Sequence, residues 1–556
     1  MAIKVPKMKI LSQMQSENIL SDKTKSFQYI SINAASFFKF ATIILAIFLI
    51  ALQLYHVFYG PIWRDDAYFG IVAKNIANGD GYKAVYFDKS YLLHYGISLG
   101  PLMILPTALA IYFFGNQSWV LGLVNILFIW GLLIAIFIYA KHFIGKERRW
   151  QFSFLALSFA IIFSNSAEIY PYGIDFKSNL ALWHLLLGEI PAALCVILGA
   201  MILFSAKNSC KRTVAGGMVL GSAALIKTIS LIIIAPILAV ASWIIFFNKY
   251  TNKNKILLIF LLGFTVIAPS LIFEASKRVS LGQESYQELK HQNKGYYKAN
   301  SLVYKPTYNN GIIVYPNRLN KVMNFKEHIG HIGIFIFLIG QFYIIYLCYK
   351  NRLADKDRYV RAAGIALMLG FYVNMLWWVF LSTGNVRYLL PGVLCYLFGI
   401  SLLITVIAYK NTRQLICVLL MISLLIISKA DAMGYLFYNG FKSNNRLEGQ
   451  LTVVKNIDML QKKGVTMFSC GNNFELEYLL QKSNNFKNCS EMFNNKDAGK
   501  SMLVTYFSYP GYVVQTGAND YYTKTMNLPA ITSNCRKNFL RGRHVSLDWC
   551  DAPTQN

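Results

Sequence analysis

The chain has 556 residues, of which 55% are hydrophobic and only 14% are charged. Because soluble proteins are about one quarter charged, this composition excludes a disordered chain, a fibrous protein and a wholly soluble enzyme, and it favours a polytopic membrane protein. The formal net charge is +28. Since cytoplasmic loops of membrane proteins collect Lys and Arg, we attribute this charge to membrane orientation and expect no nucleic-acid partner.

The first predicted element is a polar, basic cytoplasmic segment, residues 1–39, and a transmembrane domain follows over residues 40–431. This domain contains twelve apolar runs, and a membrane span needs roughly 20 residues. The runs are 40–58, 97–114, 118–140, 152–165, 188–206, 213–227, 229–247, 256–273, 330–349, 361–382, 389–409 and 414–429. The first run starts late and has no small-residue cleavage site, so we predict an anchor rather than a signal peptide.

The basic residues of the loops predict the orientation. The loops that should be cytoplasmic are 141–149, 207–212, 249–255, 350–361 and 410–413. The segments that should be external are 59–95, 166–187, 274–329, 383–388 and the tail 432–556. Twelve crossings would leave the tail inside, so the run 97–114, with Pro101 and Pro106, is a re-entrant or external half-helix, or an extra span exists. We expect a mainly α bundle of 11 to 13 spans with external juxtamembrane loop helices.

The tail, residues 432–556, is a predicted external domain. Strand patterns at 465–469 and 502–506 and a helix pattern at 475–481 indicate a small α/β domain.

The tail also contains four of the nine cysteines, and an even number in an external domain indicates disulfides. Three pairings are open, and sequence proximity favours Cys470–Cys489 with Cys535–Cys550. Zinc is the alternative, but no two of these cysteines have the short spacing of metal ligands. The other five cysteines lie in or beside apolar runs and are expected to be buried and structural.

Two adjacent acids, Asp65 and Asp66, lie directly after the first predicted span, in the loop 59–95. A carboxylate at this depth can act as general base for an external hydroxyl, and neighbouring acids raise each other's pKa. Asp before an amphipathic run is also a good helix cap. One acid can cap while the other acts as base.

Two basic residues interrupt apolar sequence. Arg387 lies at the predicted external mouth of a span, where anchoring Arg is disfavoured, and Arg binds phosphate with two hydrogen bonds. Lys227 interrupts the apolar stretch 215–247, where a charge is costly and usually has a partner. A phosphate contact and a structural ion pair are both consistent with Lys227.

The remaining candidates surround these groups. Glu189 begins an apolar run, and Asp175 and Glu168 lie in the loop before it; each is a candidate supporting acid or metal ligand, although single acids more often cap helices or face solvent. Tyr68 and His94 are further candidates in the first loop. His328 and His331 share one helical face, but no carboxylate partner is evident in the sequence. The sequence therefore assigns no cofactor and leaves a divalent metal possible.

Taken in order, these motifs resemble the GT-C superfamily of integral-membrane glycosyltransferases, of the protein O-mannosyltransferase and aminoarabinose lipid A transferase type. The matching residues are Asp65-Asp66-Ala67-Tyr68, Asn78-Gly79-Asp80-Gly81, Gly100-Pro101 to Leu105-Pro106, Leu187-Gly188-Glu189, Gly221 to Lys227, and Arg387 to Pro391. The resemblance covers roughly residues 40–410. The single motifs are short, and their ordered set is more specific than any one of them.

The resemblance implies that a sugar moves from a polyprenyl-phosphate carrier to a hydroxyl of an envelope glycan, lipid or protein, on the periplasmic face of a bacterial inner membrane. It implies that an acid of the first loop is the base; Asp66 fits the recurring pattern best and Asp65 is the alternative. The pair departs from the usual Asp-Glu, so neither the sugar nor the acceptor can be carried over.

Compartment chemistry agrees with this expectation. Nucleotide sugars are cytoplasmic, so an external transferase needs a lipid-borne donor, whose phosphate Arg387 and Lys227 would stabilise. The rival interpretation is a transporter or flippase, which would place charges mid-membrane and often contain internal repeats.

Overall fold

The computed structural model describes most of the predicted transmembrane domain and parts of the tail. The described residues are 36–60, 62, 64–86, 89–94, 96–164, 186–205, 210–247, 251–300, 307–309, 312–314, 355–382, 386–408, 445–469, 474–480, 486–488, 501–506, 535–541 and 545–550. Several predictions lie outside these residues, namely the apolar runs 330–349 and 414–429, the candidates Asp175, Glu168, His328 and His331, and the pair Cys470 and Cys489.

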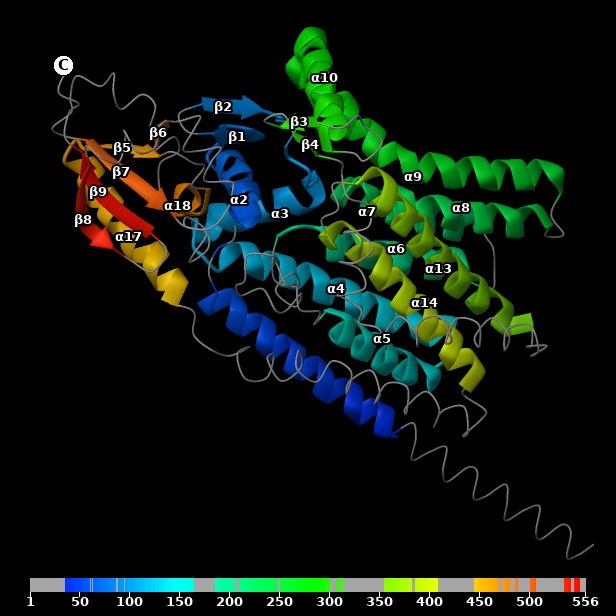
Figure 1. Ribbon diagram of the computed structural model, residues 1–556. Helices are drawn as coiled ribbons and strands as arrows, with labels where there is room; N and C mark the ends of the chain where they lie inside the picture. Colours follow the sequence, from blue (N-terminus) through cyan, green and yellow to red (C-terminus); the bar gives the residue numbers. More distant parts are fainter. Residues whose placement is uncertain are drawn as a thin grey trace, which may run out of the picture.

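Helices dominate the part of the chain that the structure describes (Figure 1). The first described helix is Ser36–Tyr59. The others of the body are α2 (Arg64–Ala77), α3 (Pro101–Phe114), α4 (Val120–Phe143), α5 (Arg148–Ser164), α6 (Glu189–Leu203), α7 (Cys210–Ile226), α8 (Ser230–Phe247), α9 (Asn252–Leu281), α10 (Gln283–Asn300), α13 (Asp355–Leu381), the 3₁₀ turn η2 (Val386–Tyr388) and α14 (Leu390–Ala408). Two short hairpins accompany them, β1 (Lys83–Tyr86) with β2 (Lys89–Leu92), and β3 (Thr307–Asn309) with β4 (Ile312–Val314).

The helices confirm the prediction of a multi-pass membrane protein. Ten of the twelve predicted apolar runs coincide with a helix, and the other two lie outside the described residues. Among the described helices, Ser36–Tyr59, α4, α8, α9 and α13 are long and apolar enough to cross a membrane. The longest, α9, has 30 residues and is therefore about 45 Å long, which exceeds the roughly 30 Å of a bilayer core.

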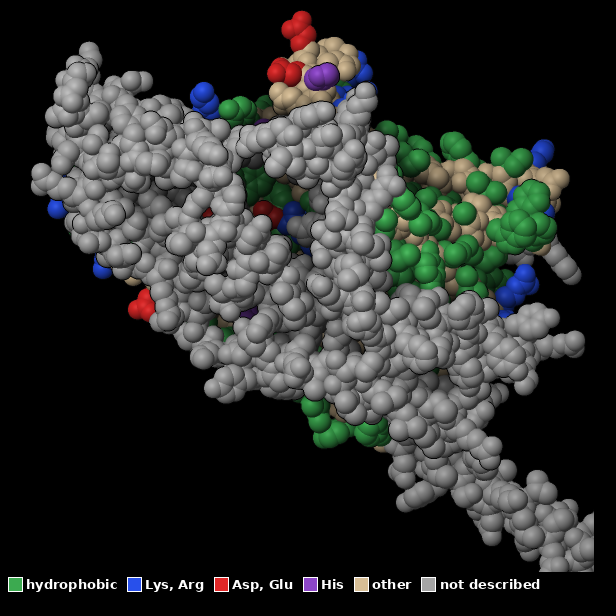
Figure 2. Space-filling view, in the orientation of Figure 1, with side chains coloured by type: hydrophobic (Ala, Val, Ile, Leu, Met, Phe, Trp, Pro, Cys, Tyr) green, Lys and Arg blue, Asp and Glu red, His purple; other side chains and the backbone are tan. Residues whose placement is uncertain are grey.

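Apolar side chains cover the outside of these long helices. On α9, the exposed residues Ile256, Phe260, Phe264 and Leu271 follow helical spacing, and Figure 2 shows hydrophobic side chains gathered over this part of the molecule. An exposed apolar face of this size is typical of a membrane contact.

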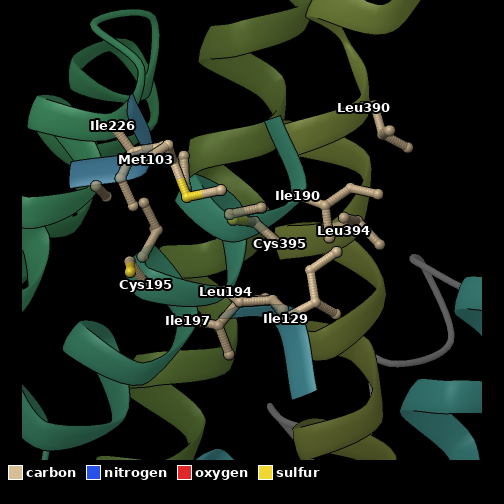
Figure 3. Packing of buried hydrophobic residues seen from close by; sticks show 14 of the residues in the cluster. Met103, Ile129, Ile190, Leu194, Cys195, Ile197, Ile226, Leu390, Leu394 and Cys395 are labelled. Carbon is tan, nitrogen blue, oxygen red and sulfur yellow. The ribbon is translucent and has the colours of Figure 1, made fainter. Parts of the chain in front are cut away.

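The core of the bundle forms around α6, which is buried along almost its whole length. Figure 3 shows side chains of α3, α4, α6 and α14 meeting there, among them Met103, Ile129, Leu194 and Leu394. Glycine allows α6 and α7 to approach closely, because a Cβ on Gly199 would lie 2.8 Å from the side chain of Leu220. Small residues at such contacts are typical of membrane helix pairs.

The helix α3 accounts for the Pro-containing run 97–114, and it has only 14 residues. Before α3, the Gly100 amide donates to the Ile226 carbonyl at the end of α7. After α3, Asn116 and Gln117 contact Tyr478, which packs against α2. Both ends of α3 therefore lie at the end of the bundle that carries α2, here called the α2 end. Of the two explanations left open by the sequence, these contacts favour the half-helix, which stays a prediction.

The tail contains the predicted α/β elements. Its helices are α17 (Asn445–Lys462) and α18 (Phe474–Leu479), and its strands are β5 (Thr466–Ser469), β6 (Lys487–Asn488), β7 (Ser501–Tyr506), β8 (Cys535–Arg541) and β9 (Val545–Cys550). The sheet order is β6-β5-β7-β9-β8, with β5 parallel to β6 and β7, and β9 antiparallel to its neighbours. The predicted strands 465–469 and 502–506 correspond to β5 and β7, whereas β8 and β9 were not predicted.

The antiparallel pair β8–β9 bears on the expected disulfides. Its register places Cys535 opposite Cys550. The bridge Cys535–Cys550 therefore joins directly opposed strand positions, and both bridges stay predictions.

Candidate functional site

The acid pair lies in the first turn of α2, where carboxylates are favoured by the free amides of a helix N-terminus. Asp66 is only 5% exposed and accepts a hydrogen bond from the amide of Leu186. Burial raises the pKa of Asp66 to about 8; the Leu186 hydrogen bond opposes this shift and the charge of Asp65 adds to it. Asp66 is thus a carboxyl group whose pKa lies near neutral pH.

The second acid, Asp65, is half-exposed and forms an ion pair with Arg387. Arg387 lies in the turn η2 between α13 and α14, where its Nη2 also donates to the Tyr388 hydroxyl at 3.2 Å. Burial lowers the pKa of Arg387, but Asp65 and Glu189 raise it by more, so the guanidinium stays charged. This pair joins the start of α2 to the start of α14.

A second ion pair lies beside the first and is almost completely buried. The Lys227 ammonium is 3.1 Å from Glu189 Oε1, and the two side chains are 4% and 3% exposed. Lys227 also donates to the Leu187 carbonyl at 3.0 Å and to the Ser98 hydroxyl at 3.2 Å. An ammonium group has three N–H donors; two of them are accepted by Leu187 and Ser98, and Glu189 adds an opposite charge at ion-pair distance.

Glu189 connects the two pairs, because its Oε1 also lies 4.0 Å from Arg387 Nε. Asp65, Arg387, Glu189 and Lys227 therefore form one chain of alternating charge, here called the charge cluster. Figure 2 shows acidic and basic side chains together inside a hollow of the molecular surface. Each member lies at or next to a helix boundary, which explains how four segments far apart in sequence meet at the α2 end.

The segments that carry the charge cluster approach each other through glycine. Gly188, which precedes Glu189, has φ of +83°, a left-handed conformation that disfavours other residues. At Gly100, a Cβ would lie 1.6 Å from the Leu225 carbonyl oxygen. The motifs containing Gly100 and Gly188 thus bring Ser98 and Leu187 within hydrogen-bonding distance of Lys227.

Tyr68 and His94 form a separate pair. The Gly96 amide donates to His94 Nδ1 at 3.1 Å, so this nitrogen is an acceptor. The Tyr68 hydroxyl, also 3.1 Å away, must then donate to the same nitrogen. Burial lowers the pKa of His94, which favours the neutral ring with its proton on Nε2.

Two further observations concern possible ligands. Among the described residues, no three His, Cys, Asp or Glu side chains are grouped to bind a metal ion. An apolar cavity of ≈ 180 Å³ lies between Ser36–Tyr59, α4 and α5, and its described lining contains no residue of the charge cluster.

Sequence reasoning missed one part of the site, the contact between α18 of the tail and α2. Tyr478 is completely buried against Gly70, and its pKa is raised by burial and by the neighbouring Asp66. Lys74 of α2 is buried too and donates to the carbonyl groups of Glu477 and Leu480. No local sequence pattern indicates these long-range partners.

No protein-family model and no curated protein matches the sequence. The structure is similar to the crystal structure of ArnT from Cupriavidus metallidurans bound to undecaprenyl phosphate, with a TM-score of 0.51 and 12% identity, over 91% of this chain and 97% of that chain. The fold is GT-C-like.

Two more solved structures are similar to this GT-C-like fold with lower TM-scores. The apo state of the same ArnT has a TM-score of 0.41 at 11% identity, over 91% of this chain and 97% of that chain. The archaeal oligosaccharyltransferase AglB from Archaeoglobus fulgidus, in complex with an inhibitory peptide and a dolichol-phosphate, has 0.47 at 11% identity, over 93% of this chain and 75% of that chain. The similarity to the ArnT structure bound to undecaprenyl phosphate confirms the predicted resemblance at the level of the fold.

Proposed function

We propose that this protein is a glycosyltransferase that moves a sugar from a polyprenyl-phosphate carrier to an acceptor hydroxyl at the α2 end. The observation that carries this proposal is the buried Asp66, whose neighbour Asp65 pairs with the guanidinium of Arg387, at one end of a membrane bundle with a GT-C-like fold. The ArnT structure contains undecaprenyl phosphate, a lipid carrier of the proposed kind.

In the proposed reaction, the acceptor oxygen forms a bond to the anomeric carbon while the bond from that carbon to the phosphate oxygen breaks. Asp66 takes the hydroxyl proton, and polyprenyl phosphate leaves. A general base works best when its pKa lies near the working pH, and a pKa of about 8 meets this condition.

The leaving phosphate needs a positive group at the same depth. Arg387 is suited to this role, because a guanidinium has five N–H donors and its side chain is 22% exposed. Lys227 fits the role less well, because its side chain is only 4% exposed, Leu187 and Ser98 accept two of its donors, and Glu189 already pairs with its charge. We therefore favour a structural ion pair for Lys227 and assign it, with Glu189, to holding Arg387 in place.

The predicted orientation of the bundle determines the compartment and the kind of donor. The basic loops predict that the α2 end is external, and a lipid-linked sugar is the donor that can be supplied there. We propose a bacterial inner membrane, with a cytoplasmic N-terminus, a periplasmic tail, and an envelope glycan, lipid or protein as acceptor.

The test uses the full chain in nanodiscs with a panel of synthetic polyprenyl-phosphate sugars and an envelope extract as acceptor source. Release of polyprenyl phosphate is followed by mass spectrometry, with Asp66→Asn as matched control. We expect release from one donor class that the control lacks. If no donor is consumed, or if the control releases as much, the proposed function is wrong.

A further inference from the structure

The tail helix α18 is buried on two sides. Leu476 and the adjoining Leu480 belong to the hydrophobic core of the tail, together with residues of α17 and β5. Phe474 and Tyr478, also four positions apart, belong instead to the hydrophobic core of the membrane bundle. This short helix is therefore shared by two cores, and it cannot move without disturbing both.

The face of α18 that enters the bundle rests on α2. A Cβ added to Gly70 would lie 2.8 Å from Tyr478 Cδ2, so the Tyr478 ring occupies the space that a side chain would take. The Tyr478 hydroxyl donates to the Gln117 carbonyl at 3.1 Å. Nearer the start of α2, the rings of Tyr68 and Phe474 lie 5.1 Å apart.

The carbonyl end of α18 is held by donors from the bundle. Asn116 Nδ2 shares its two N–H donors among the carbonyl groups of Tyr478, Leu479 and Leu480, at 2.7, 2.9 and 3.1 Å. The ammonium of Lys74 donates to the Glu477 carbonyl at 3.1 Å and to that of Leu480. The last carbonyl groups of a helix have no partners within it and carry negative partial charge, so a partly buried amide and a buried cation complete this helix.

A second contact fixes the chain just before α2. Gln450 of α17 exchanges two hydrogen bonds with the backbone of Ile62, at 3.1 and 3.0 Å. The tail thus contacts the chain on both sides of the acid pair, through Ile62 before it and through Tyr68, Gly70 and Lys74 after it.

We propose that the tail is a working part of the active site, in which Tyr478 is a positioning residue that holds α2 through Gly70 and keeps Asp66 out of water. The groups that face Asp66 are the Leu186 amide, Asp65 on its own helix and Tyr478 from α18; Arg387, Glu189 and Lys227 follow through the charge cluster. The catalytic consequence rests on the function proposed above, whereas the burial of Asp66 does not.

The first experiment needs no activity. In the full chain carrying Asp66→Cys, the rate at which a water-soluble maleimide alkylates position 66 is measured by peptide mass spectrometry. We expect slow alkylation, and an increase of about tenfold, equivalent to about 1.4 kcal/mol, when Tyr478→Ala or Gly70→Ala is added. Gly449→Ala is the matched control, because a Cβ at Gly449 has nothing within 4 Å, and Tyr478→Phe keeps the ring; neither should change the rate. Equal rates in all variants that elute as folded protein would overturn the proposal.

The second experiment uses the pH dependence of sugar transfer. Exposing Asp66 to water lowers its pKa. In a plot of transfer rate against pH, we therefore expect the midpoint of the rise on the acid side to lie about one pH unit lower in Tyr478→Ala than in the wild type. Tyr478→Phe should restore the wild-type midpoint. A midpoint unchanged in both Tyr478→Ala and Gly70→Ala would refute the positioning role. If the wild type transfers no sugar, the proposed function fails, and the alkylation rates still decide whether the tail shields position 66.

Discussion

Arg387 donates a hydrogen bond to Asp65 although 322 positions separate them in the chain. The contact forms only when the turn before α14 closes against the start of α2. Because Glu189 and Lys227 continue the same alternation of charge, the α2 end gathers four charged side chains with balanced signs. Asp66, the neighbour of Asp65, has a buried carboxyl group whose pKa is raised to about 8.

The first prediction concerns Asp66→Asn, which keeps the shape of the side chain and removes its basicity. We expect sugar transfer to fall by about 10²–10⁴-fold, the usual cost of losing a general base. In the wild type, activity should rise with pH through about 8, because the carboxylate accepts a proton only after it has lost its own. Steady-state rates between pH 5 and 10 measure both effects.

Asp65→Asn serves as the comparison for this prediction. It should cost less than Asp66→Asn, because it removes the partner of Arg387 but leaves the base. Should Asp65→Asn be the inactive variant while Asp66→Asn transfers normally, the roles of the two acids would have to be exchanged.

The second prediction concerns Arg387→Lys. Lysine keeps one positive charge but loses the planar fork that binds phosphate with two hydrogen bonds. We expect a KM for the lipid-linked donor that is about tenfold higher, corresponding to about 1.4 kcal/mol, with folding retained. A donor KM equal to that of the wild type would contradict the phosphate-binding role.

The third prediction separates Lys227 from Arg387. Lys227→Met leaves Glu189 buried without its nearest cation, and removing one partner of a buried ion pair typically costs about 3–5 kcal/mol. The double variant Lys227→Met/Glu189→Gln removes both charges, so it should recover part of that loss. Thermal unfolding in detergent ranks the stability of the wild type, Lys227→Met and the double variant. A Lys227→Met variant that unfolds like the wild type but needs more donor would instead assign Lys227 to the phosphate.

Much of this arrangement was predictable from the sequence, for a physical reason. Lipid requires long apolar helices, so apolar runs predicted the helices, and charges at the ends of such runs are costly enough to be noticed. Asp65, Glu189, Lys227 and Arg387 were all singled out in this way. Their pairing was not predictable, because the order in which helices close around α6 is not encoded in local periodicity.

The contribution of the tail to the site was harder to predict from the sequence. Amphipathic helices are recognised by a polar face, but α18 has only six residues and is buried on the tail side and on the bundle side. The helix itself was predicted at 475–481, but its six residues, with Glu475 and Glu477 among them, do not show that one side packs against the bundle. The roles of Tyr478, Lys74 and Asn116 therefore emerge only from the packing. The strands β8 and β9 were missed because their sequences combine basic, polar and aromatic residues without clear alternation.

The fourth prediction concerns the tail cysteines. The register of β8 and β9 opposes Cys535 and Cys550, so we expect this bridge together with Cys470–Cys489, each contributing roughly 2–4 kcal/mol. Peptide mapping after thiol blocking, without reduction, identifies the bridges. Cys210 was expected to be buried, but it is exposed and unbridged at the start of α7, so its alkylation in the same sample is the positive control. Four alkylated tail cysteines beside an alkylated Cys210 would rule the bridges out.

The fifth prediction concerns topology. The contact of α18 with α2 places the tail and the acid pair on the same side of the membrane. Since α3 starts and ends at the α2 end, we expect it not to cross the membrane. The other eleven predicted apolar runs are then the expected spans, and an odd number puts the termini on opposite sides. The basic loops then place the tail outside.

In a Cys210→Ser background, Asp80→Cys and Lys463→Cys should react with an impermeant maleimide in intact cells. Lys146→Cys, in an exposed basic loop, should react only after permeabilisation. Reaction of the Lys146 variant in intact cells would reverse the orientation, and opposite behaviour of the Asp80 and Lys463 variants would contradict the packing of the tail on α2.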